Sequence, residues 1–135
     1  MEKLQILLNG LQAGSLGFDF DIATDTEGRF TGTAWMSGRM RARLAKFGDV
    51  LFIDDTRSGI TSSGFSFWNV MVVNCEGKIL YGMGAMTMTH GDDAVDLVLK
   101  SLVNMFPRIQ SVAKTTMSDL GEHTSMVKPS FHPGI

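Results

Sequence analysis

The period with which apolar and polar residues alternate changes along the chain, and these changes predict the first helices and strands. Residues 1–12 carry leucines at helical spacing, and residues 18–36 alternate strictly around a central turn, as a hairpin does. The sequence of residues 37–47 predicts a second helix. Ser37 is its expected N-cap and Gly48 its expected end.

The remainder of the pattern predicts a sheet with one crossover helix. The expected elements are strands over 49–54, 65–75 and 79–89, a helix over 90–106, and a strand over 111–119. The first strand is apolar on both faces, which is typical of a central strand covered on both sides. We expect the first three strands to form an antiparallel meander and the helix to place the last strand parallel to the first. This order predicts a mixed sheet of the α+β or α/β class.

Four residues of the expected strands indicate close packing. Gly82 and Gly84 alternate on one face of the strand over 79–89, so a neighbouring group is expected to approach the backbone there. Trp35 and Trp68 are interpreted as core or interface residues.

Composition and charge fit one folded domain. The chain has 135 residues, 44% of them hydrophobic, which is enough for a core. A net charge of -2 gives no overall attraction to nucleic acid, so a polyanion could be contacted only locally, as by the basic residues of 39–46. Cys75 is the only cysteine, which excludes an internal disulfide, and we expect it to be a buried strand residue. No stretch is typical of a secretory signal or a membrane span, so we expect an intracellular protein without a membrane partner.

Two acidic residues stand where expected strands end. Asp54 ends the strand over 49–54, and Asp119 ends the strand over 111–119. In the expected topology these strands are parallel neighbours, so both acids lie at the same edge of the sheet. Carboxylates held on rigid strands and open to substrate are the hard oxygen ligands that a divalent-metal site for phosphoryl transfer requires. A solvated turn at Asp54, without a metal, stays open as the alternative.

The other polar candidates have weaker patterns. Asp55 points to the opposite face if the strand stays regular, and we interpret it as a loop-starting residue. His90 directly precedes the long helix and is interpreted as a residue of the capping region. His123 and His132 lie in the tail without metal-ligand spacing.

From about Phe18 to Asp119 the chain resembles the catalytic domain of Mutator-like element (MULE) transposases, which has a ribonuclease H-like fold. The shared elements are the "FDFDIATDTEGRFTGTAWM" hairpin, the "MRARLAKFGDVLFIDDT" helix and strand, the meander ending in "ILYGMGAMTMT", the long helix and "TTMSD". Most family members read "FGDV", a few apolar residues, then Asp-Thr-Thr-Tyr. Asp54 and Asp119 therefore take the positions of the first two catalytic aspartates. Asp55 and Arg57 depart from the family pattern, where a threonine and an aromatic residue are usual.

The resemblance implies a two-metal mechanism that cuts and joins DNA, with Mg²⁺ or Mn²⁺ held by two aspartates and a glutamate on a later helix. Asp54 and Asp119 would be the aspartates. The chain ends sixteen residues after Asp119 (135 − 119 = 16), and its only late acid is Glu122. Glu122 follows Asp119 too closely to be the third ligand of the family, although a turn could bring it near the same ion.

We therefore expect a single, partial ribonuclease H-like domain over 1–135. It would consist of an N-terminal part over 1–47, a sheet core over 48–119 and a tail over 120–135. The favoured function is a domesticated module that lacks full DNA-cleavage activity and binds a second copy or a protein partner through an uncovered sheet face. The alternative is an active or partly active Mg²⁺-dependent DNA strand transferase or nuclease. DNA binding and a nuclear location follow only from the resemblance.

Overall fold

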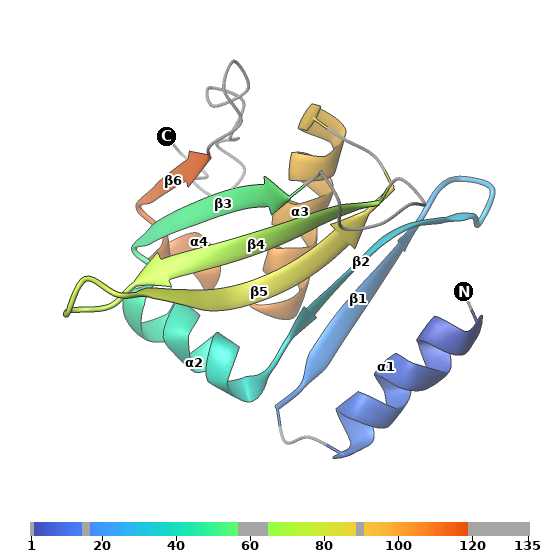
Figure 1. Cartoon of the computed structure of the whole chain (residues 1–135), viewed down its shortest axis with the longest axis horizontal. Coiled ribbons are helices and arrows are strands. Elements are labelled where there is room, and N and C mark those ends of the chain that lie inside the picture. Colours follow the sequence, from blue (N-terminus) through green and yellow to red (C-terminus); the bar gives the residue numbers. More distant parts are fainter. Residues whose placement is uncertain (1, 15–16, 57–64, 89–90, 119–135) are drawn as a thin grey trace.

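The computed structural model describes residues 2–14, 17–56, 65–88 and 91–118, which form four helices and one six-stranded sheet. In chain order the elements are α1 (Glu2–Gly14), β1 (Asp19–Thr24), β2 (Phe30–Met36), α2 (Gly38–Phe47), β3 (Val50–Thr56), β4 (Ser66–Val73), β5 (Ile79–Thr87), α3 (Gly91–Met105), α4 (Ile109–Val112) and β6 (Thr115–Ser118). The strand order across the sheet is β1-β2-β5-β4-β3-β6 (Figure 1).

The expected meander and crossover are confirmed. Strands β3, β4 and β5 pair antiparallel in sequence, and the chain then passes through α3 and α4 to β6, which pairs parallel with β3. The hairpin of β1 and β2 joins the same sheet, because β2 pairs antiparallel with β5. The molecule is thus a mixed α+β fold, and β3 lies inside the sheet between β4 and β6.

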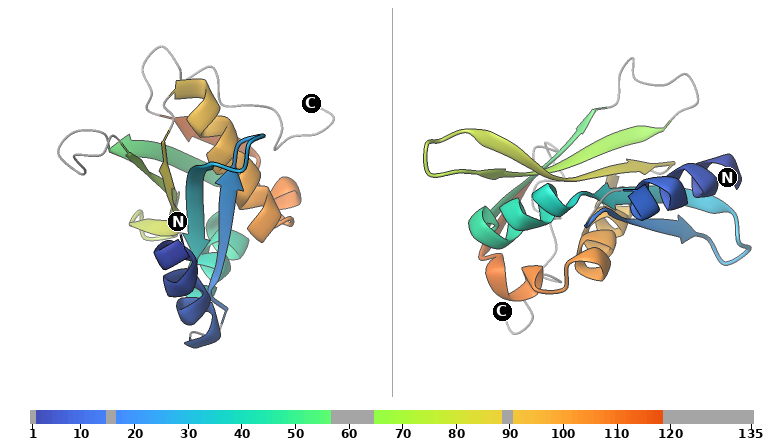
Figure 2. Two further views of the ribbon diagram at one scale, coloured as in Figure 1. Left: turned by 90° about the vertical axis from the view of Figure 1, so that its right-hand side faces the viewer. Right: turned by 90° about the horizontal axis from the view of Figure 1, so that it is seen from below.

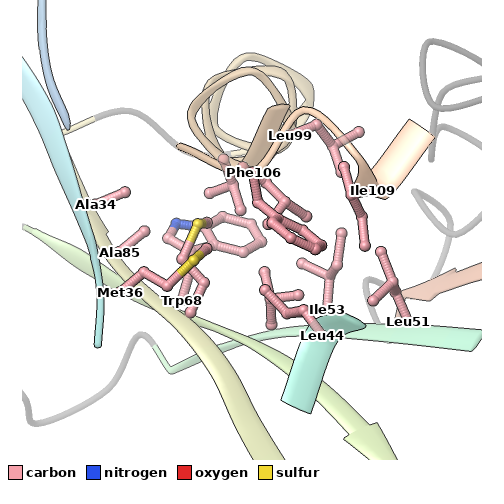
Figure 3. Packing of buried hydrophobic residues seen from close by; sticks show 14 of the residues in the cluster. Ala34, Met36, Leu44, Leu51, Ile53, Trp68, Ala85, Leu99, Phe106 and Ile109 are labelled. Atoms are coloured by element: carbon pink, nitrogen blue, oxygen red, sulfur yellow. The ribbon is translucent and has the colours of Figure 1, made fainter. Parts of the chain in front are cut away.

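The hydrophobic core lies between the sheet and helices α2, α3 and α4, which gather on one side of it (Figure 2). In β4, Trp68, Val70 and Val72 are buried, whereas the residues between them are more exposed. This alternation defines a core face of the sheet, which carries these three residues, and an outer face opposite to it. Figure 3 shows Trp68 and Ile53 packed with Leu99 and other helical residues on the core face.

Strand β3 is fully buried on one face only. Leu51 and Ile53 are buried on the core face, whereas Val50 and Phe52 are half-buried on the outer face. The prediction that this strand is covered on both sides is therefore wrong for the outer face. The physical reason is that α2, α3 and α4 pack on the core face, while α1 lies over the far end of the sheet beside β1 (Figure 1).

Helix α1 covers the outer face at the β1 end of the sheet. Between this helix and the sheet lies an open apolar groove of about 440 Å³. Its lining consists of apolar residues of α1 and of outer-face residues, with one threonine: Leu4, Leu7, Leu8, Leu11, Phe18, Thr33, Trp35, Phe67 and Met86. The outer face is therefore partly covered over β1, β2 and the adjoining ends of β5 and β4.

The two glycines of β5 face opposite sides of the sheet, so the prediction that they share a face is wrong. Gly82 is skipped in the pairing of β4 with β5, which is a bulge that inverts the alternation. A Cβ atom on Gly82 would meet Leu44 of α2 on the core face. A Cβ atom on Gly84 would lie 2.5 Å from the ring of Trp35 on the outer face. Close packing was correctly predicted at both positions.

Helix α2 begins and ends where the sequence predicts. The Ser37 hydroxyl accepts a hydrogen bond of 3.1 Å from the backbone N–H of Met40, as an N-cap does. At the other end, the backbone N–H of Gly48 donates to the carbonyl oxygen of Leu44 at 3.0 Å. These hydrogen bonds pair backbone groups that helix ends otherwise leave without partners.

Strand β3 extends to Thr56, so the prediction that Asp54 ends this strand is wrong by two residues. Other boundaries differ as well. Cys75 is exposed in the turn between β4 and β5, and the prediction of a buried strand residue is therefore wrong. Its neighbour Asn74 begins the turn early, because its side-chain oxygen accepts hydrogen bonds of 2.9 Å from two backbone N–H groups further along the turn. The last strand begins at Thr115 rather than at 111, because Ile109–Val112 form α4 and bury Ile109.

Asp25 holds the turn between β1 and β2. Its carboxylate accepts hydrogen bonds from the backbone N–H groups of Arg29 at 2.9 Å and Glu27 at 2.8 Å, and from Nε of Arg29 at 2.9 Å. The bond from the Arg29 backbone is the largest cause that lowers the pKa of Asp25 below its ordinary value. The turn is therefore stabilised by the charged form of this side chain.

Asp25 makes the stability of the fold depend on pH. Because its pKa is lower in the folded chain than in the unfolded chain, its contribution is present above the ordinary value of 3.8 and is lost as pH falls through the folded value. We expect Asp25→Asn to unfold at lower urea concentration than the wild type at neutral pH, and this difference to shrink in acid. Urea titrations from about pH 7 to about pH 2.5 measure it, and a constant difference would contradict the prediction.

Candidate metal site at the carboxyl ends of β3 and β6

Asp54 lies near the end of β3 on the outer face of the sheet. Ile53, which precedes it, is buried in the core, and side chains alternate along a strand, so Asp54 shares the outer face with Phe52. The side chain is half-buried. Its direct partner across the ladder is Asn69 of β4. The first predicted site residue is thus held on a strand inside the sheet, with its carboxylate on the outer face.

Strand β6 approaches the same edge of the sheet. Ile53 pairs with Ser118 in the parallel ladder. The described part of β6 therefore ends one residue before Asp119, beside the residue that precedes Asp54. Asp119 and Glu122 lie outside the described residues.

The other sequence candidates are not brought to this position within the described residues. The interpretation of Asp55 as a loop-starting residue is wrong, because Asp55 lies within β3 and pairs with Trp68 of β4. The side chain of Trp68 is on the core face, so Asp55 points away from the outer face, as expected. His90, His123 and His132 lie outside the described residues.

Asn69 is a potential oxygen donor that the sequence reasoning missed. Residues that are directly opposite in an antiparallel ladder have Cβ atoms roughly 5 Å apart on the same face. The amide oxygen of Asn69 and the carboxylate of Asp54 can therefore approach one ion. The signal in the sequence was an amide in the middle of the largely apolar stretch FSFWNVMVV.

The surroundings of this pair are mostly apolar. Phe52 and Met71 lie on one side along the outer face, and Phe67 lies on the other side. A charge beside such side chains is screened less than in bulk water, so Asp54 would attract a cation more strongly here than on an open surface.

Hard oxygen donors fit Mg²⁺ or Mn²⁺, and the two described donors are a carboxylate and an amide. In the described parts of the chain, no three side chains of histidine, cysteine, aspartate or glutamate are grouped so that they could hold a metal ion. Within these parts of the chain, Asp54 and Asn69 are two candidate donors and do not form a complete metal site.

None of the helices in ranges 2–14, 17–56, 65–88 and 91–118 has both the length and the apolarity needed to cross a bilayer. Comparisons with models of protein families, with curated proteins and with solved structures find no match to this chain. Its function is therefore inferred from its own residues and geometry.

Proposed function

We propose that the chain is a ribonuclease H-like domain derived from a MULE transposase, acting as an oligomerising or partner-binding module without full DNA-cleavage activity. The observation that carries this proposal is the strand order β5-β4-β3-β6, antiparallel except for the β3–β6 pair, with α3 in the crossover. The resemblance of the sequence implies this meander and crossover, with Asp54 on the first strand of the meander.

The donor set favours a module over a complete enzyme. The described residues supply one carboxylate and one amide at the end of β3, Asp54 and Asn69. A two-metal site of the family type needs three acids, and removal of one ligand typically abolishes most of the activity. The exposed apolar side chains of the outer face are, in contrast, typical of a surface that binds another molecule.

One observation favours the second candidate function, a Mg²⁺-dependent or Mn²⁺-dependent DNA strand transferase or nuclease. Ile53 and Ser118 are partners in the parallel pairing of β3 with β6. Asp54 is the residue after Ile53, and Asp119 is the residue after Ser118. A bound ion would polarise a phosphoryl oxygen of the DNA. Asp54 and Asp119 would hold that ion, and Asn69 would contribute its amide oxygen.

A thermal-shift measurement tests the metal site at Asp54, which both candidate functions would inherit from a transposase. Mn²⁺ at about ten times its dissociation constant, roughly 10 mM for a site of millimolar affinity, should raise the Tm of the wild type by on the order of 5 °C. Asp54→Asn should lose this shift. Asp55→Asn is the matched control, because it removes the same charge from the neighbouring residue on the opposite side of the strand. An equal shift in all three proteins would exclude a site at Asp54.

A cleavage assay separates the two candidates. For the module, labelled DNA should stay intact with wild-type protein and Mn²⁺, at the same level as with Asp54→Asn. If the wild type and Asp55→Asn cleave the DNA and Asp54→Asn does not, the proposal of a module without full cleavage activity is wrong. The chain is then the enzyme of the second candidate function.

A further inference from the structure

Four apolar side chains form one straight row across the outer face. Met117 of β6 pairs with Phe52 of β3, Phe52 pairs with Met71 of β4, and Met71 pairs with Tyr81 of β5. We call these four residues the methionine–aromatic row. Because paired residues of a sheet share a face, all four side chains lie on the outer face.

This row is exposed at both of its ends. Tyr81 and Met117 are each 50% exposed, while Phe52 and Met71 are half-buried between them. The next pair along β4 and β5 adds Val73 and Ile79, the latter 63% exposed. Helices α2, α3 and α4 pack on the core face, and α1 lies over β1, so none of them covers the row (Figure 2).

The geometry points to a second copy of this chain as the partner that covers the row. The row reads Met, Phe, Met, Tyr from β6 to β5. A two-fold axis between Phe52 and Met71 reverses this order, so each methionine faces an aromatic ring. Tyr81 then lies on the partner's Met117, and Phe52 lies on the partner's Met71. Such reciprocal contacts are what a two-fold interface requires, and sulfur–aromatic contacts are favourable.

Charge and area fit the same partner. Among the described residues of β3, β4, β5 and β6, Asp54 is the only charged one with its side chain on the outer face. The same axis sets Asp54 over the partner's Asn69, so no two like charges lie directly opposite each other. The row with Val73 and Ile79 exposes on the order of 400–500 Å² per copy, so a dimer buries on the order of 1,000 Å². This lies at the lower end of specific interfaces, and we expect a dissociation constant in the micromolar range.

This inference rests on the proposed function of an oligomerising or partner-binding module, and it names a second copy of the chain as the partner. It does not depend on the metal site. Sedimentation equilibrium of the purified chain, up to about 500 µM, should show a monomer–dimer equilibrium. Met117→Lys should raise the dissociation constant by about 100-fold or more, because it places a charge in the apolar contact. Met88→Lys is the matched control, since Met88 is 48% exposed, outside the row.

Cross-linking tests the two-fold geometry directly. In a Cys75→Ser background, the double variant Tyr81→Cys with Met117→Cys should give a covalent dimer with a bismaleimide that spans about 8–10 Å, the spacing of packed sheets. Each single variant should give little covalent dimer. The two-fold axis keeps the two copies of residue 81 far apart, and it does the same for the two copies of residue 117. Tyr81→Lys replaces Met117→Lys in the first experiment if the latter fails to fold.

A chain that stays monomeric at all concentrations would overturn the inference, as would a dimer that Met117→Lys and Met88→Lys weaken equally. Both results differ from a failure of the metal site. The Mn²⁺ shift at Asp54 is measured on the same purified protein, and Tyr81→Lys, which lies on β5 two strands away from Asp54, should leave it unchanged. If the chain is monomeric and Mn²⁺ still raises its Tm, only the proposed dimer is wrong. If the chain dimerises and Mn²⁺ does not raise its Tm, the proposed module stands and the metal site is wrong.

Discussion

Replacing Trp68 with alanine should lower the free energy of unfolding by about 3–5 kcal/mol, because it empties the largest fully buried side-chain position of the core. Trp68 is 1% exposed. Its Nε1 donates a hydrogen bond of 2.9 Å to Oγ1 of Thr87 on the neighbouring strand. A small domain has only about 5–15 kcal/mol of stability in total, so this variant should lose a large share of it and unfold at a much lower urea concentration than the wild type.

A graded series separates the cavity from the hydrogen bond. Trp68→Phe keeps an aromatic ring and loses the bond to Thr87, so we expect it to cost about 1–3 kcal/mol. Val73→Ala in the same strand is the control, because Val73 is 36% exposed and its truncation should cost under about 1 kcal/mol. Urea unfolding followed by far-UV circular dichroism measures all three. Equal losses for Trp68→Ala and Val73→Ala would contradict the packing shown in Figure 3.

Trp68 also links the core to the candidate site. It pairs across the ladder with Asp55, one residue from the pair of Asn69 with Asp54. A cavity at Trp68 should therefore loosen the strands that hold those two oxygen donors. If the Mn²⁺ shift depends on Asp54, Trp68→Phe should reduce it while the protein remains folded.

The periodicity of the sequence was sufficient for the order of elements, except for the short helix α4, and for most of the core. The long helix buries Val95, Leu99, Leu102 and Phe106, the residues that its apolar stripe indicated, and Val103 packs beside them. Such stripes are local, because one helix face repeats every three to four residues. The meander and the parallel last strand followed from rules of connection that allow few alternatives.

Features that depend on contacts between distant residues could not be predicted in the same way. The bulge at Gly82 inverts which side chains face the core, and no pattern within β5 marks it. The pairing of β2 with β5 joins the hairpin to the sheet through residues about fifty positions apart. Cys75 was expected in a strand because VVNC continues an apolar run, but the Asn74 side chain begins the turn first.

The candidate site was predictable only through its acids. Asp54 was found because a carboxylate at the end of an apolar strand is conspicuous in a sequence. Asn69 was missed because its role depends on the register of β3 against β4, which sets its position opposite Asp54. The methionine–aromatic row was missed for the same reason, since its four residues come from four strands and share no local pattern.

Gly84 is the second position where a substitution should have a large effect. Gly84 and Trp35 are direct partners across β2 and β5, and a Cβ atom on Gly84 would lie 2.5–2.7 Å from three atoms of the indole. Real atoms do not approach so closely, so the ring must move. The ring also lines the groove under α1, where other apolar side chains restrict its movement.

We therefore expect Gly84→Val to lower the free energy of unfolding by about 2–3 kcal/mol, the upper range for overpacking. Gly10→Ala is the control, because a Cβ atom there meets nothing within 4 Å and the residue lies in α1. That substitution should stabilise the helix by about 0.5–1 kcal/mol. Urea unfolding of both variants gives the values, and tryptophan fluorescence should shift for Gly84→Val as the Trp35 ring leaves the sheet.

A double variant shows whether the indole is the cause. Trp35→Leu shortens the side chain above Gly84, so Gly84→Val with Trp35→Leu should be destabilised by about 1–2 kcal/mol less than the sum of the single variants. Additive losses would mean that the valine is excluded by something other than Trp35. They would also mean that the approach of the ring to the backbone is not what requires glycine at this position of β5.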